Sequence, residues 1–123
     1  MILFTRVAKR YPQGGEALRN VSFHLDKGGF LFIAGPSGAG KTTITRLITA
    51  EEKPTEGSVI VAGRNISALR ASSIPYLRRN IGVIFQNFRL LENRSVAENI
   101  GIGLNVLGWR KKDVDHRVAQ LLD

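Results

Sequence analysis

The sequence predicts an α/β fold with an antiparallel β portion beside it. Two continuous apolar segments, residues 30–34 and 81–85, have the composition of strands that are buried on both faces. A helix-like stretch at residues 42–50 follows the first segment, and alternation over residues 21–25 indicates a half-buried strand before it. Buried strands separated by a helix are typical of an α/β core, and half-buried strands are typical of an antiparallel sheet.

Shorter signals predict the remaining elements of this region. A short apolar strand at residues 2–7 opens the chain, and residues 58–62 read as a strand that turns at Gly63. Pro54 stops the first helix, because proline cannot continue a helix interior, and residues 74–79 indicate a short second helix.

Two more helices are expected near the end of the sequence. Ser95 and Glu98 fit a capping box, so a helix should begin after Ser95. Its expected apolar face comprises Val96, Ile100, Leu104 and Leu107, with Gly101 and Gly103 as weak points. A last helix begins at about Lys111 and carries an apolar stripe of Val114, Val118 and Leu121. It is still in register at Asp123, which predicts that the sequence is part of a longer domain.

Composition and charge exclude several classes of function. The chain has 123 residues, a net charge of +8 and no cysteine, so it has neither a disulfide framework nor a thiolate metal site. Basic residues are scattered, with tight clusters only at residues 78–79 and 110–112, so we expect no nucleic-acid partner. No apolar run approaches the roughly 18 residues of a membrane-spanning helix, and residues 1–10 lack a signal-peptide core.

The most informative motif is the glycine-rich octapeptide at residues 35–42, Gly-Pro-Ser-Gly-Ala-Gly-Lys-Thr. It matches the phosphate-binding pattern GxxxxGK followed by Ser or Thr, and it stands between a predicted strand and a predicted helix. Its glycines would let backbone N–H groups approach phosphate oxygens, and the helix N-terminus would add a favourable field. Lys41 would reach the β- and γ-phosphates, and the Thr42 hydroxyl would help to hold Mg²⁺. An accidental glycine-rich turn is the alternative interpretation.

Three further features resemble the ATP-binding domain of ABC transporters, and the resemblance covers nearly the whole chain. Tyr11 follows the first strand, a glycine-rich turn and the segment at residues 29–37 lead into the loop, and Gln86 ends the segment at residues 81–86. Domains of this family place an adenine-stacking aromatic residue and the Q-loop glutamine at such positions. The resemblance implies a P-loop NTPase fold of the ABC ATPase type. The chain would be its N-terminal half, with an antiparallel β subdomain and the start of the helical subdomain.

The resemblance also implies a set of residues that bind ATP and Mg²⁺. The nucleotide-binding residues would be Tyr11, Gly35, Pro36, Ser37, Gly38, Ala39, Gly40, Lys41, Thr42, Thr43 and Gln86. Thr42 and Gln86 would be the metal ligands, and a neutral amide such as that of Gln86 suits a sensor of the γ-phosphate. An ordinary strand-end tyrosine and a polar strand cap remain the alternatives for Tyr11 and Gln86. Glu51 and Glu52, near a helix C-terminus, are expected to be solvated rather than catalytic.

Within the family, residues 74–91 are most similar to the cell-division ATP-binding subunits of the FtsE type. That branch implies a homodimer of ATP-binding domains and an integral membrane partner of the FtsX type. It also implies a peripheral location at the cytoplasmic face of the inner membrane, held there by this partner. Lipoprotein-release and macrolide-export subunits have related segments and are the alternatives within the family.

Several parts of the family's catalytic machinery do not occur in residues 1–123. These parts are the strand ending in Asp and then Glu (Walker B), the Leu-Ser-Gly-Gly signature and the switch histidine. The sequence therefore reads as a partial ABC domain with Walker A and the Q-loop but no catalytic residue. Since phosphoryl transfer depends on positioning and charge, we expect little or no hydrolysis by this chain alone. A non-catalytic nucleotide-binding module is the alternative from another class. A GTPase or a small-molecule kinase is disfavoured, because the guanine-reading Asn-Lys-x-Asp is absent and the placement of Tyr11 and Gln86 would be a coincidence.

Overall fold

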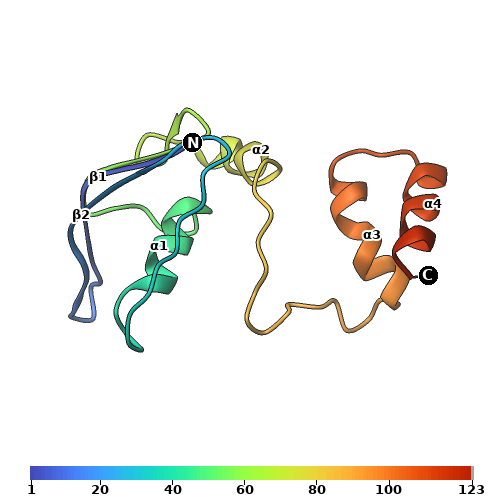
Figure 1. Cartoon of the computed structure of the whole chain (residues 1–123), viewed down its shortest axis with the longest axis horizontal. Coiled ribbons are helices and arrows are strands. Elements are labelled where there is room, and N and C mark those ends of the chain that lie inside the picture. Colours follow the sequence, from blue (N-terminus) through green and yellow to red (C-terminus); the bar gives the residue numbers. More distant parts are fainter. Residues whose placement is uncertain (123) are drawn as a thin grey trace. The chain divides into compact units, whose positions relative to one another are not determined.

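The computed structural model describes residues 1–122, which form two units along the chain. The first unit, Met1–Ile81, contains all the strands and the first two α-helices, and the second unit begins at Gly82 and contains the last two (Figure 1). The predicted register of the last helix at Asp123 lies outside the described residues.

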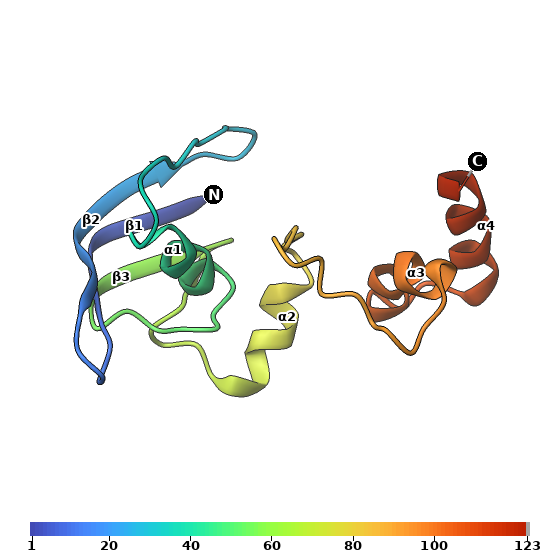
Figure 2. The same ribbon diagram turned by 90° about the horizontal axis from the view of Figure 1, so that it is seen from below.

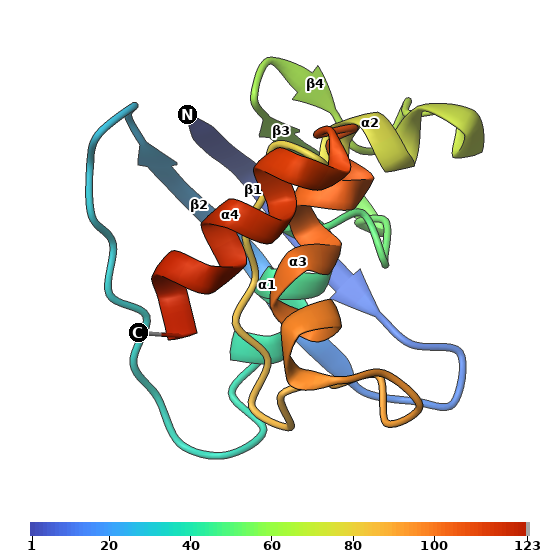
Figure 3. The ribbon, with the colours of Figure 1, turned by 90° about the vertical axis from the view of Figure 1, so that its right-hand side faces the viewer.

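A four-stranded antiparallel sheet in the order β2-β1-β3-β4 forms the base of the first unit. Its strands are β1 (Ile2–Arg10), β2 (Glu16–Leu25), β3 (Glu56–Val61) and β4 (Arg64–Asn65). Ile2 lies opposite Leu25 of β2 and opposite Val61 of β3, so β1 lies between these two strands. Figure 3 shows the short β4 beside β3. The predicted antiparallel β portion is confirmed.

A bulge in β1 brings two apolar side chains to the same face of the sheet. Phe4 and Val7 are both buried, although strict alternation would place them on opposite faces. The pairing register shifts between them, and Arg6 in the bulge has a φ of +48°. The backbone N–H of Arg6 donates to Ser22 Oγ at 2.8 Å, so the bulge leaves this donor satisfied.

Helix α1 (Lys41–Ile48) packs against one face of the sheet and completes the core there (Figure 2). Its Ile44 and Leu47 are buried with side chains from the strands, and the Phe4 ring stacks on Phe23 at 4.4 Å between ring centroids. The buried cluster comprises Phe4, Val7, Leu18, Ile44, Leu47, Val59, Val61, Ile66 and Leu77. A single core therefore holds α1, and with it the segment that precedes α1, against the sheet.

Helix α2 (Ile74–Arg78) follows a 3₁₀ turn at Ala71–Ser73 and closes the far end of α1. Leu77 is buried in the core, and Arg78 Nε donates to the backbone oxygen of Thr49 at 2.9 Å. Thr49 is the C-cap of α1, where unpaired carbonyls and the negative dipole end favour a cation. The predicted short helix is confirmed, and it stabilises the C-terminal end of α1.

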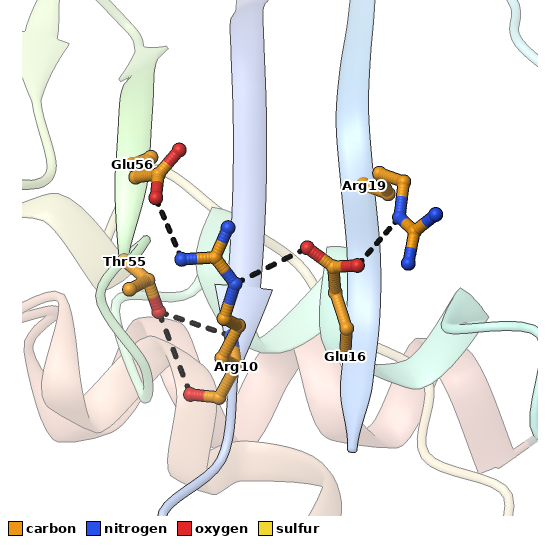
Figure 4. Close-up of polar contacts among 5 residues, drawn as sticks. All are labelled: Arg10, Glu16, Arg19, Thr55 and Glu56. Atoms are coloured by element: carbon orange, nitrogen blue, oxygen red, sulfur yellow. Dashed lines mark hydrogen bonds and ion pairs between the residues drawn. The ribbon is translucent and has the colours of Figure 1, made fainter.

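An exposed ion-pair network ties the ends of three strands together (Figure 4). Arg10 Nη1 lies 2.6 Å from Glu56 Oε1, Arg10 Nε lies 3.2 Å from Glu16 Oε1, and Glu16 also pairs with Arg19. Thr55 Oγ1 accepts the backbone N–H of Arg10 at 3.0 Å. The hydrogen bond from Arg19 lowers the pKa of Glu16, and the one to Glu56 raises the pKa of Arg10. Because the network is exposed, salt weakens it and its effect on stability is small.

Two segments predicted to be buried strands are not strands in the structure. Residues 30–34 and 81–85 are irregular, and the side chains of Phe30 and Ile84 are 90% and 100% exposed. A strand needs a neighbour for its N–H and C=O groups, and within residues 1–122 the sheet pairs its own four strands without either segment. Apolar composition indicates a preference for burial, but it cannot supply the neighbouring strand.

The second unit consists of α3 (Val96–Val106) and α4 (Lys111–Leu122), which pack against each other (Figure 3). The predicted capping box is present, because the Glu98 N–H donates to Ser95 Oγ at 3.2 Å and the Ser95 N–H to Glu98 Oε2 at 2.8 Å. The hydrogen bond from the Ser95 backbone, followed by one from the Arg94 side chain, lowers the pKa of Glu98.

The contact between α3 and α4 differs from the predicted apolar face. Gly101 is the buried residue of α3, whereas Val96, expected on the buried face, is 69% exposed. A Cβ on Gly101 would lie 2.9 Å from Val114 Cγ1 and 3.3 Å from Val118 Cγ2. The sequence did not predict this packing role of Gly101, whose missing side chain lets the two helices approach. Val114 and Val118 are buried as predicted, but Leu121 is exposed.

Candidate functional site

The predicted phosphate-binding loop enters α1 through two glycines whose backbone conformation favours glycine. Gly38 and Gly40 have φ angles of +80° and +88°, in the left-handed region. A Cβ on Gly40 would collide with the backbone oxygen of Ala17 and lie 2.8 Å from Leu18 Cδ2. The loop thus packs directly on strand β2 at Gly40. Both the positive φ of Gly40 and its close approach to β2 require glycine there.

The N-terminus of α1 presents backbone donors at this loop. Gly40 is the N-cap without a side-chain cap bond, and the first helical bond runs from the Ile44 N–H to the Gly40 oxygen at 3.1 Å. The N–H groups of residues 41–43 precede that bond, and the first turn of α1 contains no acidic side chain. Such donors at the positive end of a helix dipole favour an anion.

Lys41 lies folded over its own loop. Its Nζ donates to the backbone oxygens of Gly35 at 2.7 Å and Pro36 at 2.6 Å. The ammonium therefore adds a positive charge to the donors of the α1 N-terminus. Thr42, the predicted magnesium ligand next to Lys41, is exposed.

Tyr11 lies beside α1, in contact with another predicted site residue. Its hydroxyl oxygen is 3.4 Å from Thr43 Oγ1, and Thr43 is buried at 7% exposure. Tyr11 follows β1, and Thr43 belongs to α1. The structure thus brings together two residues that were predicted to bind nucleotide, and their roles remain predictions.

The sequence did not predict that Lys9 would stand next to Tyr11. Lys9 Nζ is 5.1 Å from the centroid of the Tyr11 ring and 2.7 Å from Glu52 Oε2. The expected solvation of Glu52 is thus only partial, because its side chain is 30% exposed and paired with Lys9. Lys9 and Glu52 are 43 positions apart, so no local pattern indicates the pair.

Gln86 belongs to the second unit and is exposed. Its role as metal ligand and γ-phosphate sensor remains a prediction. Among residues 1–122, no helix has the length and apolar character that a membrane crossing requires.

Comparisons with known proteins agree with the predicted family. The family model for ABC transporters matches residues 18–123. The chain is 40% identical over 123 residues to the cell division ATP-binding protein FtsE of Bacillus subtilis strain 168, covering all of this chain and 54% of that protein. It is 44% identical over 126 residues to the methionine import ATP-binding protein MetN 2 of Yersinia pestis bv. Antiqua (strain Antiqua), covering all of this chain and 38% of that protein.

A solved structure supports the predicted fold class. The ATP-binding cassette MJ0796, in a dimeric post-hydrolysis state bound to ADP and Pi, matches with a TM-score of 0.87 and 31% sequence identity. That match covers 98% of this chain and 55% of the cassette.

The chain spans about half the length of the FtsE relative and less of the MetN relative. The family model nevertheless covers most of the chain, and the glycine-dependent loop at the start of α1 lies within the matched residues. The chain belongs to the ABC transporter family.

Proposed function

We propose that the chain is the nucleotide-binding part of an ABC-type ATP-binding subunit and that it binds ATP at residues 35–43. The observation that carries this proposal is the left-handed Gly40, seated on the Ala17 carbonyl at the uncapped N-terminus of α1. Lys41 supplies the positive charge at that point. The presence of ADP and Pi in the related cassette MJ0796 supports the same ligand class.

In this proposal the phosphates lie along the loop and the base lies against Tyr11. The N–H groups at the start of α1 donate to the phosphate oxygens, and Lys41 exchanges its loop carbonyls for the β- and γ-phosphates. The aromatic ring of Tyr11 offers a flat apolar face, and stacking of a base on such a face contributes about 1–3 kcal/mol.

Magnesium is the proposed metal of the site. The exposed Thr42 hydroxyl is a neutral oxygen donor, which suits a hard cation that keeps most of its ligands as water and phosphate oxygen. The amide oxygen of Gln86 is the second proposed ligand. When bound, Mg²⁺ would neutralise charge on the phosphates, and Thr42 would orient it.

We propose that this chain binds ATP but hydrolyses it slowly or not at all. Phosphoryl transfer needs a group to orient the attacking water and charge to stabilise the transition state. Within residues 1–123 we find the loop lysine and the Q-loop glutamine but neither the Asp-Glu pair nor the signature sequence. Binding and hydrolysis should therefore be measured separately.

For the partners, we propose an FtsE-like role at the inner membrane. The similarity to FtsE over the whole chain supports a cell-division subunit that pairs with an FtsX-type integral membrane protein. The subunit would lie at the cytoplasmic face of that membrane. The dimeric structure of MJ0796 supports a homodimer of ATP-binding domains in the longer protein.

A methionine-import role is the second candidate. Its support is the 44% identity to MetN 2, which is as high as the identity to the FtsE relatives. Purification of the subunit together with its membrane partner separates the two: an FtsX-type protein supports the first role, and an importer permease supports the second.

Isothermal calorimetry with ATP tests the site. Changing Lys41 to Ala should weaken ATP binding by about 100-fold or more, because charge-assisted bonds to phosphate are lost from a site that depends on them. Chelation of Mg²⁺ should weaken ATP binding to the unchanged chain as well.

Lys27→Ala is the matched control, because Lys27 is an exposed lysine in a turn and lies outside the proposed site residues. This variant should bind ATP as the unchanged chain does. Equal ATP affinity of the Lys41→Ala and Lys27→Ala variants would contradict the site assignment.

A further inference from the structure

Lys9 lies beside Tyr11 of the proposed site and has no role in the function proposed above. Its side chain extends from β1 and is only 12% exposed. The ammonium is 2.7 Å from Glu52 Oε2 and donates to the backbone oxygen of Lys53 at 2.9 Å. Two acceptors from the segment after α1 thus fix this charge in one place.

The fixed ammonium faces an aromatic ring. Lys9 Nζ lies 5.1 Å from the centroid of the Tyr11 ring, within the range of a cation–π interaction. A cation over one face of a ring leaves the opposite face for a planar ligand. It also draws electron density from the ring, which strengthens stacking of an electron-rich base on that opposite face.

Tyr11 is held at its other end by α1. The hydroxyl oxygen lies 3.4 Å from Oγ1 of the buried Thr43, which follows the two residues proposed to contact phosphate and metal. The ring is therefore restrained at two points, by the ammonium on one face and by the helix at its hydroxyl. Such preorganisation reduces the conformational entropy lost when a ligand binds.

We propose that Lys9 is a positioning residue for the base of the nucleotide, acting through Tyr11. The inference rests on the proposed function, because it requires that the loop binds the phosphates of a nucleotide. Lys9 itself does not touch the phosphates in this proposal. Its charge contributes to the affinity for a purine nucleotide and not to the affinity for the phosphate chain.

Lys9 also connects β1 with the segment after α1, and this structural role has to be separated from the positioning role. Loss of the connection would disturb the loop and weaken every ligand equally. Loss of the positioning role would weaken only ligands that carry a base. Comparison of ATP with inorganic tripolyphosphate distinguishes the two effects, because tripolyphosphate has the same phosphate chain without a base.

The experiment is a calorimetric titration of the 123-residue chain with ATP and with tripolyphosphate, each in Mg²⁺ at one ionic strength. Lys9→Met keeps the apolar stem and removes the charge. It should weaken ATP binding by about three- to tenfold and leave tripolyphosphate binding within about twofold. Lys9→Arg keeps a cation over the ring and should restore most of the ATP affinity.

Lys53→Met is the matched control. Lys53 Nζ also ties segments together, through bonds of 3.2 Å to the backbone oxygens of Ser67 and Leu69, but it is not the lysine over Tyr11. This variant should bind both ligands as the unchanged chain does. Thermal unfolding of each variant shows whether it is folded.

Two results with Lys9→Met would overturn the inference: an equal loss for ATP and tripolyphosphate, or no loss for either. If the unchanged chain binds both ligands with the same affinity, the phosphate site stands and the inference about the base falls. If the unchanged chain binds neither ligand, the proposed function is wrong, and the inference falls with it.

Discussion

The two units of the chain are held together in different ways. In the first unit, nine buried side chains from strands and helices form one cluster, with Leu47 of α1 fully buried among them. Among residues 82–122 of the second unit, the buried residues are Gly101, Val114 and Val118, at the contact between two helices. Hydrogen bonds between residues close in sequence, such as those of Ser95 with Glu98, also stabilise the start of α3.

This difference shows which contacts fix the position of a site. The phosphate-binding loop rests on β2 and enters a helix whose other face lies in the core, so distant residues determine its geometry. The segment that carries Gln86 lies in the unit with few buried residues and many exposed apolar ones. The exposed large apolar side chains of that unit include Ile84, Phe88, Leu90, Leu91, Val96 and Trp109.

The largest expected effect comes from removing the core side chain of α1. Leu47→Ala should reduce the free energy of unfolding by about 2–5 kcal/mol, because it removes buried methyl groups and leaves a cavity. Ile84→Ala, at a fully exposed apolar side chain of the second unit, should change it by less than about 0.5 kcal/mol. Urea denaturation followed by circular dichroism measures both. Similar losses in the two variants would contradict the contrast between the units.

The next effect concerns the single close contact of the second unit. Gly101→Ile should destabilise the pair of helices by about 1–3 kcal/mol, because its side chain must displace Val114 and Val118. Gly103→Ala is the matched control: a Cβ there has open space around it, and alanine should stabilise α3 by about 0.5–1 kcal/mol. Thermal unfolding at 222 nm reports both. Destabilisation by Gly103→Ala would show that the close contact is assigned to the wrong glycine.

The smallest effect is a pH dependence that belongs to the second unit. The folded state lowers the pKa of Glu98, so the ionised carboxylate stabilises α3 above its unfolded pKa of about 4.3. That stabilisation is lost as the pH falls through the lower folded pKa. Helicity should therefore decrease below about pH 4.3, and Glu98→Gln, which keeps a capping side chain, should reduce this pH dependence.

Glu16 provides the comparison in the first unit. Its pKa is also lowered, chiefly by the hydrogen bond from Arg19, so Glu16→Gln should reduce acid sensitivity in the sheet and leave α3 unaffected. Circular dichroism of the two variants between neutral and acid pH separates these contributions. A pH profile of α3 that is the same with Gln and Glu at position 98 would rule out the capping carboxylate as its cause.

Local signals predicted the parts of the fold that depend on near neighbours. The loop glycines and the capping box of Ser95 and Glu98 each concern residues within one turn of the chain, and the structure has the elements that they predict. The predicted stop at Pro54 does not set the end of α1, because this helix already ends at Ile48 with Thr49 as its C-cap. The alternation at residues 21–25 likewise predicted β2, because one buried face is enough to produce it.

The errors concern contacts between residues far apart in the sequence. Residues 30–34 have the composition of a buried strand, but composition does not say which strand pairs with them. The pairing of Lys9 with Glu52 and the burial of Gly101 by Val114 have the same cause, because each depends on how two elements meet. The sequence therefore did not predict the ion pair that fixes the Lys9 ammonium beside the Tyr11 ring.

The folded-back Lys41 would make ligand binding at the proposed site an exchange reaction. Its ammonium already has two carbonyl partners, at Gly35 and Pro36, so an incoming anion has to replace both at once. A polyphosphate presents several oxygens that can do so, whereas a small anion such as chloride offers one weak acceptor and leaves the lysine where it is. We therefore expect the proposed site to discriminate among anions by the number of acceptors they offer.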